Sequence, residues 1–198
     1  MGTKGDATRE KIITTSLQLF SVKGFYNTSV ADILAATGLT KGGLYGHYKS
    51  KEEIWFAAYD RAVAVWKEIV FKGVRTVEDP LERLEKALDN DLTRYLGGDV
   101  FQGGCFFLNT LVEVAGQSGV MQDHLFKGIM GFSTVIRTWL EEARDKEMLR
   151  PDLDLEAAAK FVVVSLNGCA ALYAAGRDPA IWQITLEQLK CFINGLKK

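Results

Sequence analysis

The chain has 198 residues, of which 47% are hydrophobic and 25% are charged, and its formal net charge is −1. This composition is typical of a soluble globular protein with a sizeable core, and it argues against a chain that binds polyanions over its whole surface. The three cysteines, Cys105, Cys169 and Cys191, are odd in number and widely spaced. That pattern excludes a disulfide framework and favours reduced thiols in the cytoplasm.

Charge is unevenly distributed. Residues 1–50 carry a net charge of +3 and the remainder −4, which fits a small polyanion-binding module on a larger body. The first ten residues contain no apolar signal core. The longest uncharged run, residues 161–176, is short for a membrane span and contains Ser165 and Asn167. We therefore expect a cytoplasmic protein without membrane association.

Three short helices are predicted first. An apolar face of Ile13, Leu17 and Phe20 indicates a helix that ends at Gly24. The second helix begins after Thr28 or Ser29 as N-cap and ends at a glycine, residue 38. The third is expected over residues 41–47 with Thr40 as its cap. A Ser-x-x-Glu capping box at residues 50–53 then begins a helix over 51–73, which we expect to connect two domains.

Longer helices follow. Asp79 and Pro80 are typical of a helix start, and a stripe of leucines at 81, 84, 88 and 92 continues to Gly97. Further helices are predicted over residues 104–115, 119–147, 155–175 and 179–196, and no alternating strand pattern occurs. The sequence thus predicts an all-α fold of about nine helices, with one internal boundary that divides residues 1–50 from residues 51–198.

The segment "LTKGGLYGHYKSKEEI", residues 39–54, is rich in glycine between two helices. Glycine disfavours a helix by about 1 kcal/mol relative to alanine. A helix-turn-helix explains it, because a glycine-containing turn joins the two helices and the second one enters the DNA major groove. Gly42 then lets the backbone approach phosphates and bases closely. The alternative is a plain turn in which Tyr45 and Tyr48 pack on the first helix.

Residues 8–60 resemble the DNA-binding domain of the TetR family of bacterial transcriptional regulators, most closely in "GLTKGGLYGHYKSKEEI". The resemblance implies DNA contacts at Thr28, Thr40, Lys41, Gly42, Gly43, Tyr45, His47, Tyr48 and Lys51. Two positions depart from the pattern, because the family often has larger side chains where Gly43 and Gly46 stand. Few side chains are then left to read bases.

The same resemblance implies a DNA-binding domain in residues 1–50 and a ligand-binding and dimerisation domain in residues 51–198. It also implies a homodimer formed by the last two helices, a pseudo-palindromic double-stranded DNA operator and a small-molecule effector. The effector pocket is expected among the helices between the connector and the dimer interface. Its candidate lining residues are aromatic, small or isolated polar side chains: Trp66, Tyr95, Cys105, Phe106, Asn109, Phe132, Trp139, Asn167 and Tyr173. At each aromatic position simple core packing is the alternative. We expect a mostly apolar effector that releases the protein from its operator.

The sequence leaves two alternative functional classes. An enzyme is disfavoured, because the chain has two histidines and lacks a nucleophile–base pair, a metal cluster and a phosphate-binding loop; no catalytic residue, metal or cofactor is expected. The second class is a redox or electrophile sensor, which keeps the DNA-binding half and changes only the input, to covalent chemistry at Cys105. Cys105 follows two glycines near the start of a predicted helix, and a helix N-terminus lowers the pKa of a thiol. The alternative is that Cys105 packs beside Phe106 and Phe107.

Overall fold

The computed structural model describes residues 4–117 and 119–198. Its helices are α1 (Lys4–Lys23), α2 (Val30–Thr37), α3 (Lys41–Tyr45), α4 (Lys51–Val70), α5 (Pro80–Asp89), the π-helical segment η1 (Asn90–Leu96), α6 (Phe106–Val114), α7 (Val120–Asp145), α8 (Leu155–Gly176) and α9 (Pro179–Leu196). Within those two ranges the only β-type pairing is one isolated antiparallel bridge between Leu149 and Lys197. The predicted all-α fold is confirmed.

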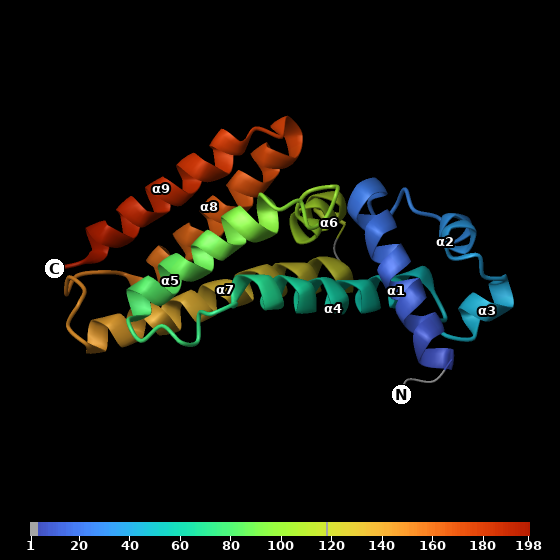
Figure 1. Ribbon diagram of the computed structural model, residues 1–198, viewed down its shortest axis with the longest axis horizontal. Helices are drawn as coiled ribbons and strands as arrows, with labels where there is room; N and C mark the ends of the chain where they lie inside the picture. The colour runs from blue at the N-terminus through green and yellow to red at the C-terminus, as the bar shows by residue number, and fades with distance from the viewer. Residues whose placement is uncertain (1–3, 118) are drawn as a thin grey trace.

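The first three helices form one end of an elongated molecule (Figure 1). Helix α2 begins at Ser29, whose hydroxyl accepts a hydrogen bond from the Asp32 amide at 3.1 Å, while the Asp32 carboxylate accepts one from the Ser29 amide at 2.8 Å. The reciprocal pair satisfies two backbone donors that the helix leaves free. Of the two caps considered, Ser29 is therefore the one used. Helix α2 ends at Gly38, which has a left-handed φ of 67°.

Helix α4 leads from this end into the body of the molecule and packs against α1 (Figure 1). Ser50 caps it by accepting a hydrogen bond from the Glu53 amide at 3.2 Å. Ile54, Ala58 and Ala62 are buried as their spacing predicts. The helix ends at Val70, three residues earlier than expected, because the chain then turns towards α5.

Helix α5 matches the predicted N-cap and leucine stripe, whereas the π-helical form of η1 does not follow from the sequence pattern. The Asp79 carboxylate accepts hydrogen bonds from the amides of Leu81 and Glu82 at 2.7 and 3.2 Å, and the predicted leucine stripe is buried. From Asn90 the α-helix widens into a π-helix. The buried side-chain amide of Asn90 donates to the carbonyl oxygens of Val70 and Lys72 at 3.0 and 3.1 Å. This segment is thereby tied to the end of α4, and π-helical turns of this kind are frequent at functional sites.

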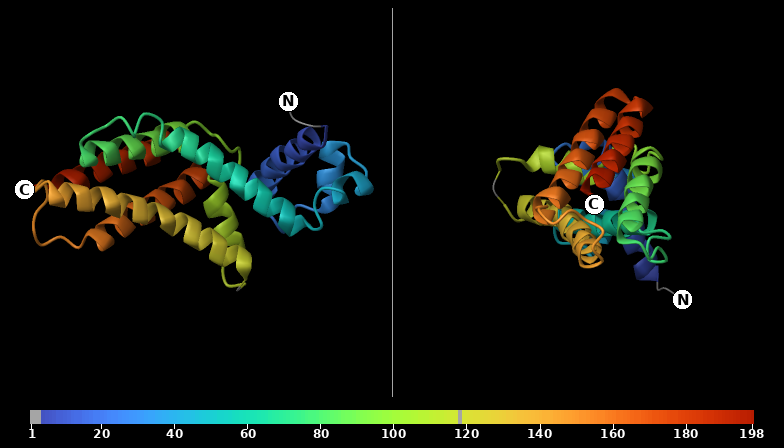
Figure 2. Two further views of the ribbon diagram at one scale, coloured as in Figure 1. Left: turned by 90° about the horizontal axis from the view of Figure 1, so that it is seen from below. Right: turned by 90° about the vertical axis from the view of Figure 1, so that its left-hand side faces the viewer.

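Helices α7, α8 and α9 complete the body, and α8 packs against both of the others. Figure 2 shows α8 and α9 as a pair along one side of the body. Helix α8 is long and apolar enough, by length and composition alone, to cross a membrane, and 44% of its most apolar window is buried. Its contacts with α7 and α9 fit the core helix of a folded body.

Candidate DNA-binding surface and ligand pocket

Helix α3 is the second helix of a helix-turn-helix. Its N-cap is Thr40, whose hydroxyl accepts a hydrogen bond from the Gly43 amide at 3.2 Å. Leu44 is fully buried and anchors the helix to the domain, whereas Lys41 is exposed and Tyr45 is 48% exposed. The helix ends at Tyr45, two residues earlier than expected. It therefore presents a short exposed face beside an anchored apolar side chain.

The glycines of α3 are not required by the fold of the chain. None of Gly42, Gly43 and Gly46 has a positive φ. A Cβ atom added at Gly42 would meet no heavy atom within 4 Å, and one at Gly43 would lie 3.4 Å from the Thr40 hydroxyl, an ordinary contact. Since neither backbone geometry nor packing excludes a side chain at Gly42 or Gly43, the space is open to a partner outside the chain.

Three residues expected to contact DNA, Thr28, Tyr48 and Lys51, have side chains that are buried or bonded within the chain. Thr28 is fully buried, and its hydroxyl donates to the Gly24 carbonyl at 2.6 Å. Tyr48 is only 4% exposed, with the Arg9 guanidinium 5.0 Å from its ring centroid, and burial raises the pKa of its phenol. These two side chains support the domain from within. The exposed face retains Thr40, Lys41, Gly42 and Tyr45, with Gly43 and His47 half-buried beside them.

The third is Lys51, whose ammonium group is occupied within the chain. It donates to the carbonyl oxygens of Phe25 and Thr28 at 2.8 and 3.0 Å, and lies 4.1 Å from the centroid of the Phe25 ring. Lys51 thus ties the start of α4 to the turn between α1 and α2. Its role in the structure is to position the helices rather than to present a free charge.

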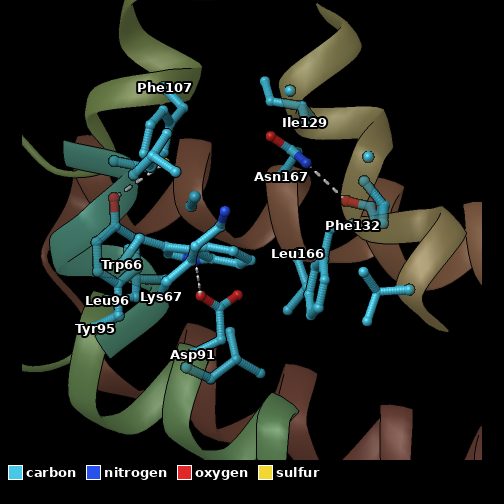
Figure 3. A pocket seen from close by; sticks show the side chains of 18 of the residues that line it. Trp66, Lys67, Asp91, Tyr95, Leu96, Phe107, Ile129, Phe132, Leu166 and Asn167 are labelled. Atoms are coloured by element: carbon cyan, nitrogen blue, oxygen red, sulfur yellow. Dashed lines mark hydrogen bonds between the residues drawn. The ribbon is translucent and has the colours of Figure 1, made fainter. Parts of the chain in front are cut away.

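A cavity of about 360 Å³ lies in the body among α4, η1, α6, α7 and α8 (Figure 3). Its walls are mostly aromatic and aliphatic, with a few polar groups, as expected of a small-molecule site. The lining residues are Tyr59, Val63, Trp66, Lys67, Phe71, Asp91, Leu92, Tyr95, Leu96, Cys105, Phe107, Gly128, Ile129, Gly131, Phe132, Val135, Val163, Leu166, Asn167 and Ala170.

Five of the nine expected pocket residues line this cavity: Trp66, Tyr95, Cys105, Phe132 and Asn167. The Asn167 amide donates to the Val163 carbonyl at 2.8 Å. The Tyr95 hydroxyl donates to the Cys105 sulfur at 3.8 Å. Asn167 and Tyr95 therefore place polar groups in a wall that is mostly apolar.

The other four expected pocket residues point elsewhere. Phe106 is fully buried, with its ring centroid 6.2 Å from that of Trp55, and Trp139 packs against Phe71. The hydroxyl of Tyr173 donates to an Asp99 carboxylate oxygen at 3.4 Å.

The Asn109 amide donates to the carbonyl of Gly103 at 2.7 Å. It thereby fixes the loop before α6 rather than anchoring a ligand. All four of these side chains support the cavity wall or the loops around it.

Asp91 is the functional candidate that sequence reasoning missed. It lies in the cavity wall, where one carboxylate oxygen accepts a hydrogen bond from the Trp66 indole at 2.8 Å (Figure 3). Burial raises the pKa of Asp91 from 3.8 to about 6, against a smaller lowering by the Trp66 hydrogen bond. Its spacing from Leu84 and Leu88 to Tyr95 puts it on the apolar face of the helix. An acid on that face is a signal of a buried carboxylate.

Cys105 does not have the environment of an activated thiol. The expectation was a pKa lowered by a helix N-terminus. Burial instead raises the pKa of the Cys105 thiol, and hydrogen bonds from nearby backbone amides and Tyr95 offset this only in part. A thiolate is the reactive form of cysteine, so the covalent-sensor alternative is not supported.

Helix α6 joins the cavity to the N-terminal domain. Phe107 at its start lines the cavity, whereas Glu113 near its end contacts the turn between α1 and α2. The two carboxylate oxygens of Glu113 accept hydrogen bonds from the amides of Phe25 and Tyr26 at 2.7 and 2.8 Å. The Tyr26 hydroxyl also donates to Gln117 at 2.8 Å. Helix α6 thus contacts both the cavity and the N-terminal domain.

Helix α1 is held at a second point by the loop before α6. A Cβ atom added at Gly103 would lie 1.7 Å from the Ser21 carbonyl oxygen at the end of α1. Only glycine permits so close an approach of the two backbones. The loop before α6 therefore packs directly against the end of α1.

These features define the class of protein: a helix-turn-helix DNA-binding regulator with a ligand-sized cavity in its helical body. Sequence models of two families match the chain. Residues 12–58 match the one described as bacterial regulatory proteins, tetR family, and residues 80–189 match the tetracyclin repressor-like C-terminal domain. The chain belongs to the TetR family of transcriptional regulators, which are DNA-binding proteins and not enzymes.

Individual relatives agree with this assignment. An uncharacterised HTH-type transcriptional regulator from Lactococcus lactis is 33% identical over 109 residues, which cover 54% of this chain and 55%, about half, of that protein. The HTH-type transcriptional repressor DhaR from Mycobacterium is 25% identical over 163 residues, covering 81% and 79% of the two chains. The crystal structure of a TetR family regulator from Cytophaga hutchinsonii has a TM-score of 0.88 and 27% identity, covering 100% of this chain and 98% of that one.

Proposed function

We propose that the protein is a dimeric, ligand-responsive transcriptional repressor that acts in the cytoplasm and releases a pseudo-palindromic operator when an effector enters its cavity. The exposed face of α3 supports the DNA-binding half of this proposal. Thr40, Lys41 and Tyr45 supply polar groups there, and Gly42 leaves room for the DNA backbone. In a dimer, the two copies of this helix enter two successive major grooves. The DhaR relative is itself described as a repressor.

The outer face of α8 and α9 supports the dimer. Val164 and Leu172 on α8 are 65% and 63% exposed, and Ile184 on α9 is 57% exposed. Gly168 and Ala171 lie on the same side of α8 and are exposed as well, and a Cβ atom at Gly168 would meet nothing within 4 Å. Large apolar side chains next to small ones permit a second copy to pack closely.

The single observation that carries the proposal is the span of α6 between the cavity and the DNA-binding domain. An effector shifts the equilibrium only if it binds one arrangement of the two domains better than the other. A ligand that displaces Phe107 moves α6, and Glu113 transmits that shift to the amides of Phe25 and Tyr26. The two copies of α3 then no longer match the spacing of the operator half-sites.

A pocket-filling substitution tests this coupling without an identified effector. Gly131 lines the cavity on α7, and a Cβ atom there would meet nothing within 4 Å. Gly131→Leu should therefore place a side chain where an effector would sit, and it should weaken operator binding about tenfold, within the usual range of allosteric coupling. The matched control is Gly131→Ala, which makes a similar change in helix propensity and adds little volume.

Combining Gly131→Leu with Glu113→Gln tests the route of the signal. If α6 carries it through Glu113, the leucine should lose most of its effect on operator affinity in the double variant. Equal operator affinities for Gly131→Leu and Gly131→Ala, measured by fluorescence anisotropy on folded dimers, would contradict the proposed coupling.

A further inference from the structure

Asp91 has a carboxylate oxygen available to a ligand. One oxygen accepts the Trp66 indole hydrogen bond at 2.8 Å, and in the described part of the chain no other hydrogen bond or ion pair engages the Asp91 side chain. The residue is 9% exposed and its carboxylate faces the cavity below Trp66 (Figure 3). A buried carboxylate with a single neutral partner is poorly compensated. A ligand that brings a positive charge supplies the missing partner.

The groups around Asp91 do not supply that charge. Helix α4 contributes Lys67, which is exposed and forms no ion pair with Asp91 among the described residues. Tyr95 on η1, Cys105 before α6 and Cys169 on α8 are neutral, because burial raises the pKa of each. The cavity-lining residues of α7 carry no titratable side chain. Asp91 is thus the acidic side chain among the cavity-lining residues.

The cavity walls suit a cation as well. The ring centroids of Trp66 and Phe132 lie 5.0 Å apart with planes at 84°, and Phe71 packs on Phe132 at 6.1 Å. Tyr59 and Phe107, which also line the cavity, meet edge-to-face at 5.5 Å. Aromatic faces attract a cation through their quadrupoles, most strongly where water is excluded. A carboxylate beside several aromatic rings is therefore a site for a positively charged group on an apolar body.

We propose that the effector is an organic cation, an amine or quaternary ammonium group on an aromatic or alkyl body, with its positive charge beside Asp91 and its body against Trp66 and Phe132. The inference rests on the proposed function, in which an effector occupies this cavity. A neutral apolar compound of the same shape leaves the carboxylate uncompensated. An anion meets repulsion from Asp91, and Lys67 offers it only a solvated partner.

The test compares three benzyl compounds: benzyltrimethylammonium, its uncharged isostere neopentylbenzene, and the smaller anion phenylacetate. Binding to the full-length protein is followed by ligand-observed NMR. The cation should bind about tenfold or more tightly than the other two. Asp91→Asn keeps an acceptor for Trp66 and should remove that preference. Asp89→Asn, which removes a carboxylate outside the cavity lining, is the matched control and should retain it.

The pH dependence gives a second readout. Because burial raises the pKa of Asp91 to about 6, protonation should weaken cation binding about tenfold between a pH of about 7 and about 5. Equal binding of the cation and neopentylbenzene, preference for phenylacetate, or an unchanged cation affinity in Asp91→Asn would each overturn the inference.

Operator release is measured separately by anisotropy. If neopentylbenzene binds as well as the cation and releases DNA, the ligand class is wrong and the proposed function survives. Binding that depends on Asp91 without release supports the ligand class and contradicts the proposed coupling.

Discussion

Replacing Asp91 by asparagine should stabilise the folded protein in the absence of ligand. Burial raises the pKa of Asp91 from 3.8 to about 6, only partly offset by the Trp66 hydrogen bond. Keeping this carboxylate ionised therefore costs the folded state free energy. Asparagine has nearly the same shape, carries no charge and keeps an oxygen that can accept the hydrogen bond from the Trp66 indole.

The size and sign of the effect follow from the two pKa values. The shift of roughly two units corresponds to about 3 kcal/mol, at about 1.4 kcal/mol per unit. The unfolded chain loses the Asp91 proton near 3.8 and the folded chain near 6. The destabilisation by the ionised carboxylate is thus absent below the pKa of the unfolded chain, grows between the two pKa values, and is complete above the pKa of the folded chain. Asp91→Asn should gain about 3 kcal/mol at a pH of about 8 and about half of that at about 5.

Urea unfolding of both proteins at several pH values, at one fixed protein concentration because a dimer is expected, measures this difference. Asp89→Asn, which removes a carboxylate outside the cavity lining, is the control for the loss of one carboxylate. A loss of stability in Asp91→Asn, or a gain that does not change with pH, would refute the reasoning.

Three further substitutions test the account. Gly42→Ala should raise the free energy of unfolding by up to about 1 kcal/mol, since alanine favours helix α3, and should still weaken operator binding. Normal operator binding, measured by fluorescence anisotropy, would show that DNA does not use the space at Gly42. Ala171→Glu places a charge on the outer face of α8 and should yield monomers in light scattering, because burying an unpaired charge costs several kcal/mol; a dimeric mass would argue against this interface. Lys51→Ala should lower the free energy of unfolding by about 1–3 kcal/mol, because two carbonyl groups lose a charged donor. Unchanged stability together with weaker DNA binding would instead indicate that Lys51 contacts DNA.

Local signals in the sequence predicted most of the fold. The capping residues Ser50 and Asp79 and the leucine stripe of α5 act over a few neighbouring residues, and each is found as predicted. The π-helix was not predictable in this way. It depends on Asn90 bonding to Val70, twenty residues earlier, which is a tertiary contact. Helical periodicity alone cannot show where a helix widens.

The candidate site was predictable only in part, for a similar reason. A motif resemblance marks positions and does not say which side chains are exposed. Thr28 and Lys51 match the motif, yet one is buried and the other bonds to the carbonyl of Phe25, 26 residues away. In the body, aromatic spacing did not distinguish Trp66, which lines the cavity, from Trp139, which does not. Trp139 packs against the lining residue Phe71.

Selection of bound fragments from a genomic DNA library by the purified protein tests the central claim most directly. The account predicts an enriched pseudo-palindrome whose half-site centres lie about one helical turn or a multiple of it apart. Wild-type protein should bind this site at roughly 10⁻⁸ to 10⁻¹¹ M, with affinity falling steeply as salt increases. Tyr45→Ala, which alters an exposed side chain of α3, should weaken that binding while remaining folded. No enriched sequence, or equal binding by wild type and Tyr45→Ala, would contradict the account.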